Sequence, residues 1–104
     1  MLRQAFKLKL KPGGAAEYEK RHDELWPELA AALKAAGVSD YSIFLDEDTL
    51  TLFAVQTVSH PKAVADLAHA PIVRRWWEFM APLLDTHPDG SPVVHPLREV
   101  FRLD

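Results

Sequence analysis

The sequence predicts an α+β fold in which four strands and two helical regions follow one another in the order βαββαβ. Three observations predict it. Apolar and polar residues alternate near the start and in the middle of the chain, as they do in half-buried strands. Two longer stretches repeat apolar residues at helical spacing. The 104 residues are also about the length of one domain, so we expect a single domain over residues 1–104.

The first strand and the first helical region are separated by a glycine turn. Residues 6–10 alternate phenylalanine or leucine with lysine, and Pro12-Gly13-Gly14 ends the strand. Helical spacing then runs from residue 15 to Gly37, interrupted by Pro27. Because proline is tolerated only in the first turn of a helix, we expect a helix near 15–23 and a second, bent from it, from about Pro27.

A β-hairpin is predicted in the middle of the chain. Residues 41–45 have strand-like alternation, Asp46-Glu47-Asp48 forms the turn, and a β-rich segment covers residues 50–58.

The last third predicts one more helical region and one more strand. Ser59 can cap a helix that starts near Pro61, and a second helical stretch starts at Pro71. The turn-rich residues 85–92 separate it from a short apolar segment, 97–103, which we predict to be the fourth strand.

This order is the split βαβ pattern of ferredoxin-like domains, in which an antiparallel sheet carries helices on one face. The other face is left open, although the hairpin places Phe53 and Val55 on one side and Leu52 and Ala54 on the other. Something apolar should therefore cover the open face. A second copy of the chain is the simplest cover, and we expect a homodimer.

Composition excludes several classes of protein. Twelve basic and fifteen acidic residues give a formal charge of −3 without a basic stripe, so nucleic acid is not an expected partner. The chain has no cysteine, no signal-peptide pattern and no apolar run long enough to span a membrane. These features favour a cytoplasmic protein. The five histidines lack metal-ligand spacing, so no metal site is predicted.

Tyr18 and His22 lie four residues apart, so they share one helix face, and Trp26 continues the row. Histidine gives and takes protons near neutral pH, which makes His22 the natural general acid or base. The spacing alone fits equally a histidine that only hydrogen-bonds within the core.

Neighbouring helical residues point about 100° apart, so Trp76 and Trp77 cannot share one face. One ring could fill an interface between subunits, or the pair could form a wall that binds a carbohydrate. For Arg74-Arg75, surface ion pairs with Asp66 and Glu78 are the expected role.

Four separated motifs occur in order along the chain: Tyr18-x-x-Arg21-His22-x-x-x-Trp26-Pro27-Glu28-Leu29, Asp40-Tyr41-Ser42-Ile43-Phe44-Leu45-Asp46, Arg75-Trp76-Trp77-x-x-Met80 and Pro88-Asp89-x-Ser91-Pro92-Val93. Together they resemble the L-rhamnose mutarotase family. The resemblance runs from the first strand to the C-terminus, but His87 and Gly90 stand where similar sequences are expected to have Asn.

The resemblance implies a dimeric α/β barrel of ferredoxin-like protomers that interconverts the α and β anomers of L-rhamnose without cofactor or metal. It also implies that His22 is the proton donor and that Tyr18, Tyr41, Trp76 and Trp77 hold the sugar. The partner base stays open between Tyr18, a water molecule and a carboxylate. The fold alone also fits a small-molecule binding module or a cofactor-free monooxygenase-like enzyme.

Overall fold

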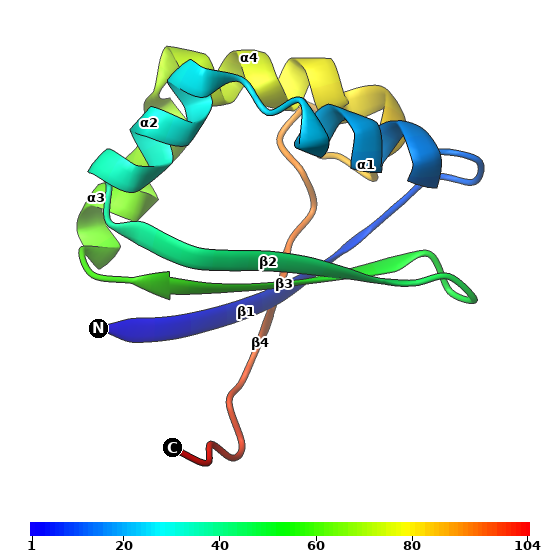
Figure 1. The fold of residues 1–104 in the computed structure, drawn as a ribbon. Helices are drawn as coiled ribbons and strands as arrows, with labels where there is room; N and C mark the ends of the chain where they lie inside the picture. Colours follow the sequence, from blue (N-terminus) through cyan, green and yellow to red (C-terminus); the bar gives the residue numbers. More distant parts are fainter.

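The computed structural model describes residues 1–104 and shows one four-stranded sheet with the helices gathered on one of its faces (Figure 1). The strand order is β2-β3-β1-β4, and all neighbouring strands are antiparallel. This confirms the predicted α+β class. The elements are β1 (Leu2–Lys9), α1 (Ala15–Asp23), α2 (Pro27–Ala35), β2 (Val38–Asp46), β3 (Thr51–Val58), α3 (Pro61–Asp66), the 3-10 helix η1 (Leu67–His69), α4 (Pro71–Met80), the 3-10 helix η2 (Ala81–Leu83) and β4 (His95–Leu97).

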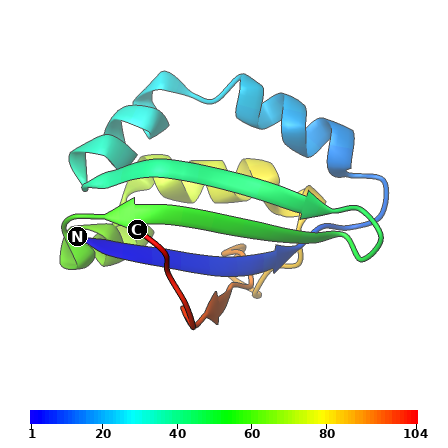
Figure 2. The same ribbon diagram turned by 60° about the horizontal axis from the view of Figure 1, so that its bottom comes forward.

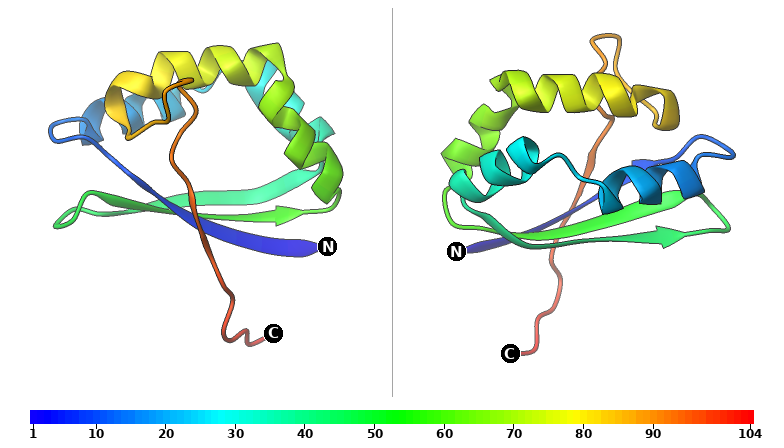
Figure 3. Two further views of the ribbon diagram at one scale, coloured as in Figure 1. Left: turned by 180° about the vertical axis from the view of Figure 1, so that it is seen from behind. Right: turned by 45° about the horizontal axis from the view of Figure 1, so that its top comes forward.

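The core lies between the sheet and the layer formed by α1, α2 and α4. Seen from above, α1 and α2 follow one another beside α4 (Figure 3). Because side chains alternate along a strand, every second residue of β3 points into this layer. These residues are the most deeply buried of the strand: Leu52, Ala54, Gln56 and Val58.

The first helical region divides where proline predicts it. Helix α1 ends at Asp23, and α2 begins at Pro27, in the first-turn position where a missing N–H is harmless. Gly37 ends the region with φ +95°, a conformation that favours glycine. A Cβ atom at Gly37 would collide with the hydroxyl of Ser59, so a larger residue there would force Ser59 to move.

Ser59 does not cap α3, contrary to the prediction. Its hydroxyl donates to the carbonyl of Gly37 at 3.2 Å, and His60 occupies the position before the helix without a side-chain cap. Ser59 instead links the start of β2 to the end of β3, because the two neighbouring strands bring Gly37 close to it.

The predicted fourth strand over residues 97–103 was wrong beyond Leu97. Strand β4 covers only His95–Leu97 and pairs with residues 5–7 of β1. The chain then leaves the sheet on the side away from the helices, where no strand is present to supply ladder hydrogen bonds (Figure 1). We call residues 98–104 the C-terminal tail; its Val100, Phe101 and Leu103 are exposed.

The sheet face opposite the helices is open, and Figure 2 turns it towards the viewer. Phe44 and Phe53 are direct partners across β2 and β3 and remain 64% and 36% exposed. The predicted two-sided apolar character of the hairpin is therefore present in the structure.

Candidate active site

Helix α1 presents Tyr18 and His22 one turn apart on the face that points towards α4. Their ring centroids are 4.3 Å apart; Tyr18 is buried, whereas His22 is half-buried. Nδ1 of His22 lies 2.9 Å from the carbonyl oxygen of Tyr18. Because a carbonyl oxygen only accepts hydrogen bonds, Nδ1 must carry a hydrogen. Nε2 is therefore the ring nitrogen that can exchange a proton with a ligand.

Trp76 of α4 joins this pair from the opposite helix. Val73, Trp76 and Met80 form the buried face of α4 at helical spacing. The edge of the Trp76 ring system meets His22 at a centroid distance of 5.4 Å, and Trp26 packs against Trp76 at 5.1 Å. Two members of the predicted row, His22 and Trp26, thus meet Trp76, although Trp26 precedes α2 and is not part of α1.

Tyr41 approaches the cluster from β2. Its ring stands edge-on to Phe6 of β1, with centroids 6.5 Å apart. Desolvation of the hydroxyl raises the pKa of Tyr41 to about 12, although 40% of the residue's surface is open. Burial, and secondarily the nearby Tyr41, raise the pKa of Tyr18 well above its usual range. Both phenols therefore stay protonated at neutral pH, which favours hydrogen bonding to a ligand over a role as the base.

Trp77 takes no part in the ring contacts that join His22, Trp26 and Trp76, because the 100° rotation between neighbours turns it to another face of α4. The guanidinium of Arg74 lies 5.6 Å from its ring centroid. Together with Asp89 and Gly90 of the loop that follows η2, these two side chains line a cavity of about 230 Å³. The sequence therefore identified both indoles, but the structure brings only Trp76 into contact with His22.

The ion pairs of Arg74 and Arg75 differ from those predicted. Arg74 lies 3.9 Å from Asp89, and Arg75 lies 3.8 Å from Glu28 of α2. Both arginines reach to other elements, which local spacing along the sequence could not show. All four side chains are largely exposed, so the pairs contribute little to stability.

Arg21 is a neighbour of the site that sequence reasoning missed. Its Nε donates to Glu17 at 2.7 Å, and another guanidinium nitrogen donates to the carbonyl of Phe79 at 2.5 Å. The guanidinium also stacks 4.0 Å above the Phe79 ring. Arg21 thereby ties α1 to the end of α4. The four-residue spacing of Glu17 and Arg21 indicates their ion pair from the sequence alone. The contact between Arg21 and Phe79 joins residues 58 positions apart, so the sequence gives no sign of it.

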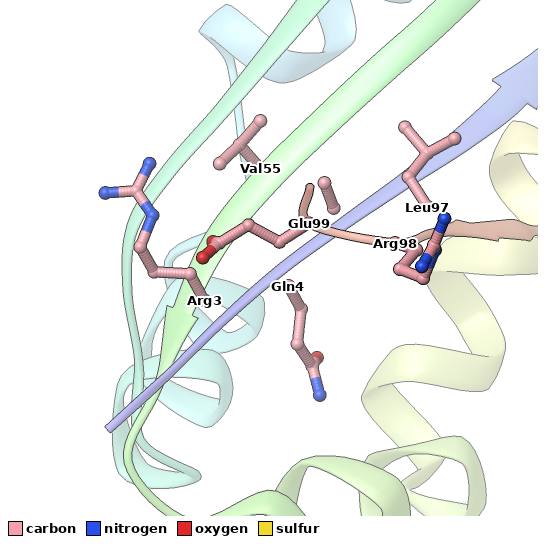
Figure 4. A pocket seen from close by; sticks show the side chains of 7 residues that line it. Arg3, Gln4, Val55, Leu97, Arg98 and Glu99 are labelled. Carbon is pink, nitrogen blue, oxygen red and sulfur yellow. The ribbon is translucent and has the colours of Figure 1, made fainter. Parts of the chain in front are cut away.

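A second cavity, of about 220 Å³, lies beside β1, β3 and the beginning of the C-terminal tail, and contains none of the predicted site residues. Figure 4 shows Val55 and Leu97 beside the charged side chains of Arg3, Arg98 and Glu99. The structure contains no cluster of three or more His, Asp or Glu residues placed to bind a metal ion. None of its helices has the length and apolar character needed to cross a membrane.

A half-buried histidine among aromatic rings, carried by a helix-covered antiparallel sheet, defines an α+β protein with a candidate site for proton-transfer chemistry. The chain belongs to the L-rhamnose mutarotase family, whose family model matches residues 3–103. It is 54% identical to an L-rhamnose mutarotase of Formosa agariphila and 52% identical to one of Bacteroides thetaiotaomicron, in both cases over 100% of each chain.

A solved structure agrees with this assignment. The fold is similar to the crystal structure of the Formosa agariphila L-rhamnose mutarotase, with a TM-score of 0.94, 53% identity and 100% of both chains covered. It also shares its fold with a conserved protein from Methanosarcina mazei, with a TM-score of 0.64 and 16% identity over 93% of this chain and 90% of the other.

Proposed function

We propose that residues 1–104 act as one mutarotase domain that interconverts the α and β anomers of L-rhamnose, with His22 as the proton donor. The observation that carries this role is the hydrogen bond from Nδ1 of His22 to the carbonyl of Tyr18 at 2.9 Å. It fixes the ring and leaves Nε2 available, and His22 is the one group in the cluster suited to proton exchange near neutral pH.

The reaction needs only proton movements. A pyranose changes anomer when its ring oxygen gains a proton and its anomeric hydroxyl loses one, which opens the ring to the aldehyde. Rotation about the C1–C2 bond presents the other face of the carbonyl, and reversal of the two proton transfers closes the ring. In this scheme, Nε2 of His22 delivers the proton to the ring oxygen and receives it again on closure.

The remaining side chains bind and orient the sugar. The neutral hydroxyls of Tyr18 and Tyr41 hydrogen-bond to sugar hydroxyls, and Trp76 offers an apolar surface to C–H groups beside His22. Trp77 offers a second apolar face from the cavity that it lines with Arg74, Asp89 and Gly90. Because the raised pKa values keep both tyrosines protonated, we assign the proton of the anomeric hydroxyl to a water molecule rather than to Tyr18.

The sugar preference follows from the 6-methyl group of L-rhamnose. L-mannose, its 6-hydroxy counterpart, brings a polar group to the apolar wall of the pocket. An apolar pocket discriminates against an added hydroxyl only moderately, by about 10²-fold in catalytic efficiency. A sugar of different ring configuration, such as L-fucose, misplaces hydroxyls that polar groups must match. We expect the order L-rhamnose, L-mannose, L-fucose in catalytic efficiency, measured by polarimetry of freshly dissolved anomers. Equal efficiency for L-rhamnose and L-fucose would contradict the proposed pocket.

A homodimer, forming the dimeric α/β barrel, is the second part of the proposal. Phe44, Phe53 and Leu97 leave an apolar open face on the sheet, and the C-terminal tail exposes further apolar residues. Two copies related by a twofold axis bring identical open faces together, so each covers the other.

Sedimentation equilibrium at micromolar concentration should give a mass about twice the 11.7 kDa of one chain. Phe53→Asp should shift this mass towards the monomer, because it buries a charge in the sheet–sheet contact. Ala65→Asp adds the same charge at an exposed position of α3 and should leave the dimer intact. A parent chain that sediments at 11.7 kDa would disprove the dimer.

A further inference from the structure

Strand β2 contains one extra residue directly before Tyr41. Its pairing with β3 joins Ser39 to Thr57 and then Ser42 to Val55. Two residues of β2, Asp40 and Tyr41, therefore lie opposite a single residue of β3. This arrangement is a β-bulge, a feature that redirects side chains and is common beside active sites.

The bulge changes which residues of β2 face the helices. Val38 is buried, and it pairs with the fully buried Val58. Tyr41 contacts Phe6, whose pairing with Ala54 places it on the same side of the sheet. Val38 and Tyr41 are three residues apart, and on a regular strand an odd separation puts two side chains on opposite faces. The extra residue lets both face the helices.

Asp40 supplies that extra residue in an unusual backbone conformation. Its φ is +49°, in the left-handed region. Glycine, asparagine and aspartate tolerate this region, whereas β-branched residues strongly disfavour it. A β-branched residue at this position would therefore work against the bulge.

We propose that Asp40 is a positioning residue for the sugar site: its left-handed conformation maintains the β-bulge that turns Tyr41 to the helix-covered face of the sheet, the side on which Tyr18 and His22 lie. This rests on the proposed function, because Tyr41 matters here only if it binds the sugar. Asp40 acts through the backbone, so its carboxylate is dispensable.

The test compares Asp40→Val with Asp40→Gly in the full-length protein. Asp40→Gly permits positive φ and should keep KM for L-rhamnose near the parent value. Asp40→Val should raise KM about tenfold, the effect of one lost hydrogen bond to the sugar, with a smaller change in kcat. If Asp40→Val fails to fold, Asp40→Ala is compared with Asp40→Gly in its place. We expect a smaller increase in KM for Asp40→Ala than for Asp40→Val.

Leu50→Val is the matched control for strain in general. Leu50 has φ +59° in the turn between β2 and β3, so the substitution introduces a similar conflict far along the hairpin. It should lower thermal stability and leave KM unchanged. An equal rise in KM in Leu50→Val would overturn the proposal, because general strain would then explain the effect.

A double-mutant cycle tests whether Asp40 acts through Tyr41. In a Tyr41→Ala background, Asp40→Val should raise KM no further. The proposal fails if folded Asp40→Val keeps the parent KM, or if folded Asp40→Ala does so when used in its place. It also fails if the substitution at Asp40 still raises KM in the Tyr41→Ala background. A parent protein that does not accelerate anomer exchange would instead refute the proposed function, so the two failures are distinguishable.

Discussion

His22→Ala is expected to slow the interconversion of L-rhamnose anomers by about 10²- to 10⁴-fold, the usual contribution of one positioned acid–base group. The variant removes the imidazole whose Nδ1 bonds to the Tyr18 carbonyl, and with it the proton that Nε2 delivers. The fold should survive, because His22 is only half-buried at the edge of the aromatic cluster. Initial rates by polarimetry and far-ultraviolet circular dichroism give the two readouts.

Two further variants make this result specific. His22→Gln keeps a polar side chain of similar reach but cannot transfer a proton at neutral pH, so it should be nearly as slow as His22→Ala. His69→Ala removes an exposed histidine at the end of η1 and should retain full activity. A folded His22→Ala or His22→Gln that is as fast as the parent would show that His22 only packs and hydrogen-bonds within the core.

Trp76→Ala is expected to lower the free energy of unfolding by about 3–5 kcal/mol, as large aromatic truncations in cores do. Trp76 is 9% exposed and packs against His22, Trp26 and Phe79, so its removal leaves a cavity between α1, α2 and α4. Trp77→Ala should cost clearly less, because Trp77 is only half-buried and borders an open cavity. Urea unfolding of the two variants measures this difference.

The same tryptophans should differ in sugar binding. Trp76→Phe keeps the core filled, so it isolates the loss of the indole ring from the loss of stability; Trp77→Phe is its matched partner. Each should weaken L-rhamnose binding in saturation curves, with the larger effect at Trp76, because this ring contacts His22. Unchanged affinity in both variants would contradict the proposed sugar wall.

Local rules predicted much of the fold and the shared helix face of two candidate site residues, Tyr18 and His22. Proline in the first helical turn placed the break before α2, and positive φ at Gly37 agrees with its predicted role as a helix stop. The four-residue spacing of Tyr18 and His22 was sufficient to predict that they lie together on one face of α1, because residues four apart on a helix are neighbours. These features depend only on neighbours in the sequence.

The remaining features depend on partners far along the chain. The face taken by Tyr41 is set by a bulge in its pairing with β3, and alternation within β2 carries no sign of an extra residue. Ser59 bonds to Gly37 rather than capping α3, because two adjacent strands bring them together. The C-terminal tail has strand-like composition, but composition alone does not provide a neighbouring strand to pair with.

The most direct measurement of the central claim is exchange NMR between the two anomeric proton signals of L-rhamnose at equilibrium, with and without the protein. We expect faster exchange in proportion to the amount of added protein, no new product, and loss of this acceleration in His22→Ala. Exchange at the same rate with and without the folded parent protein would contradict the proposed function, because the protein would then not catalyse mutarotation of this sugar.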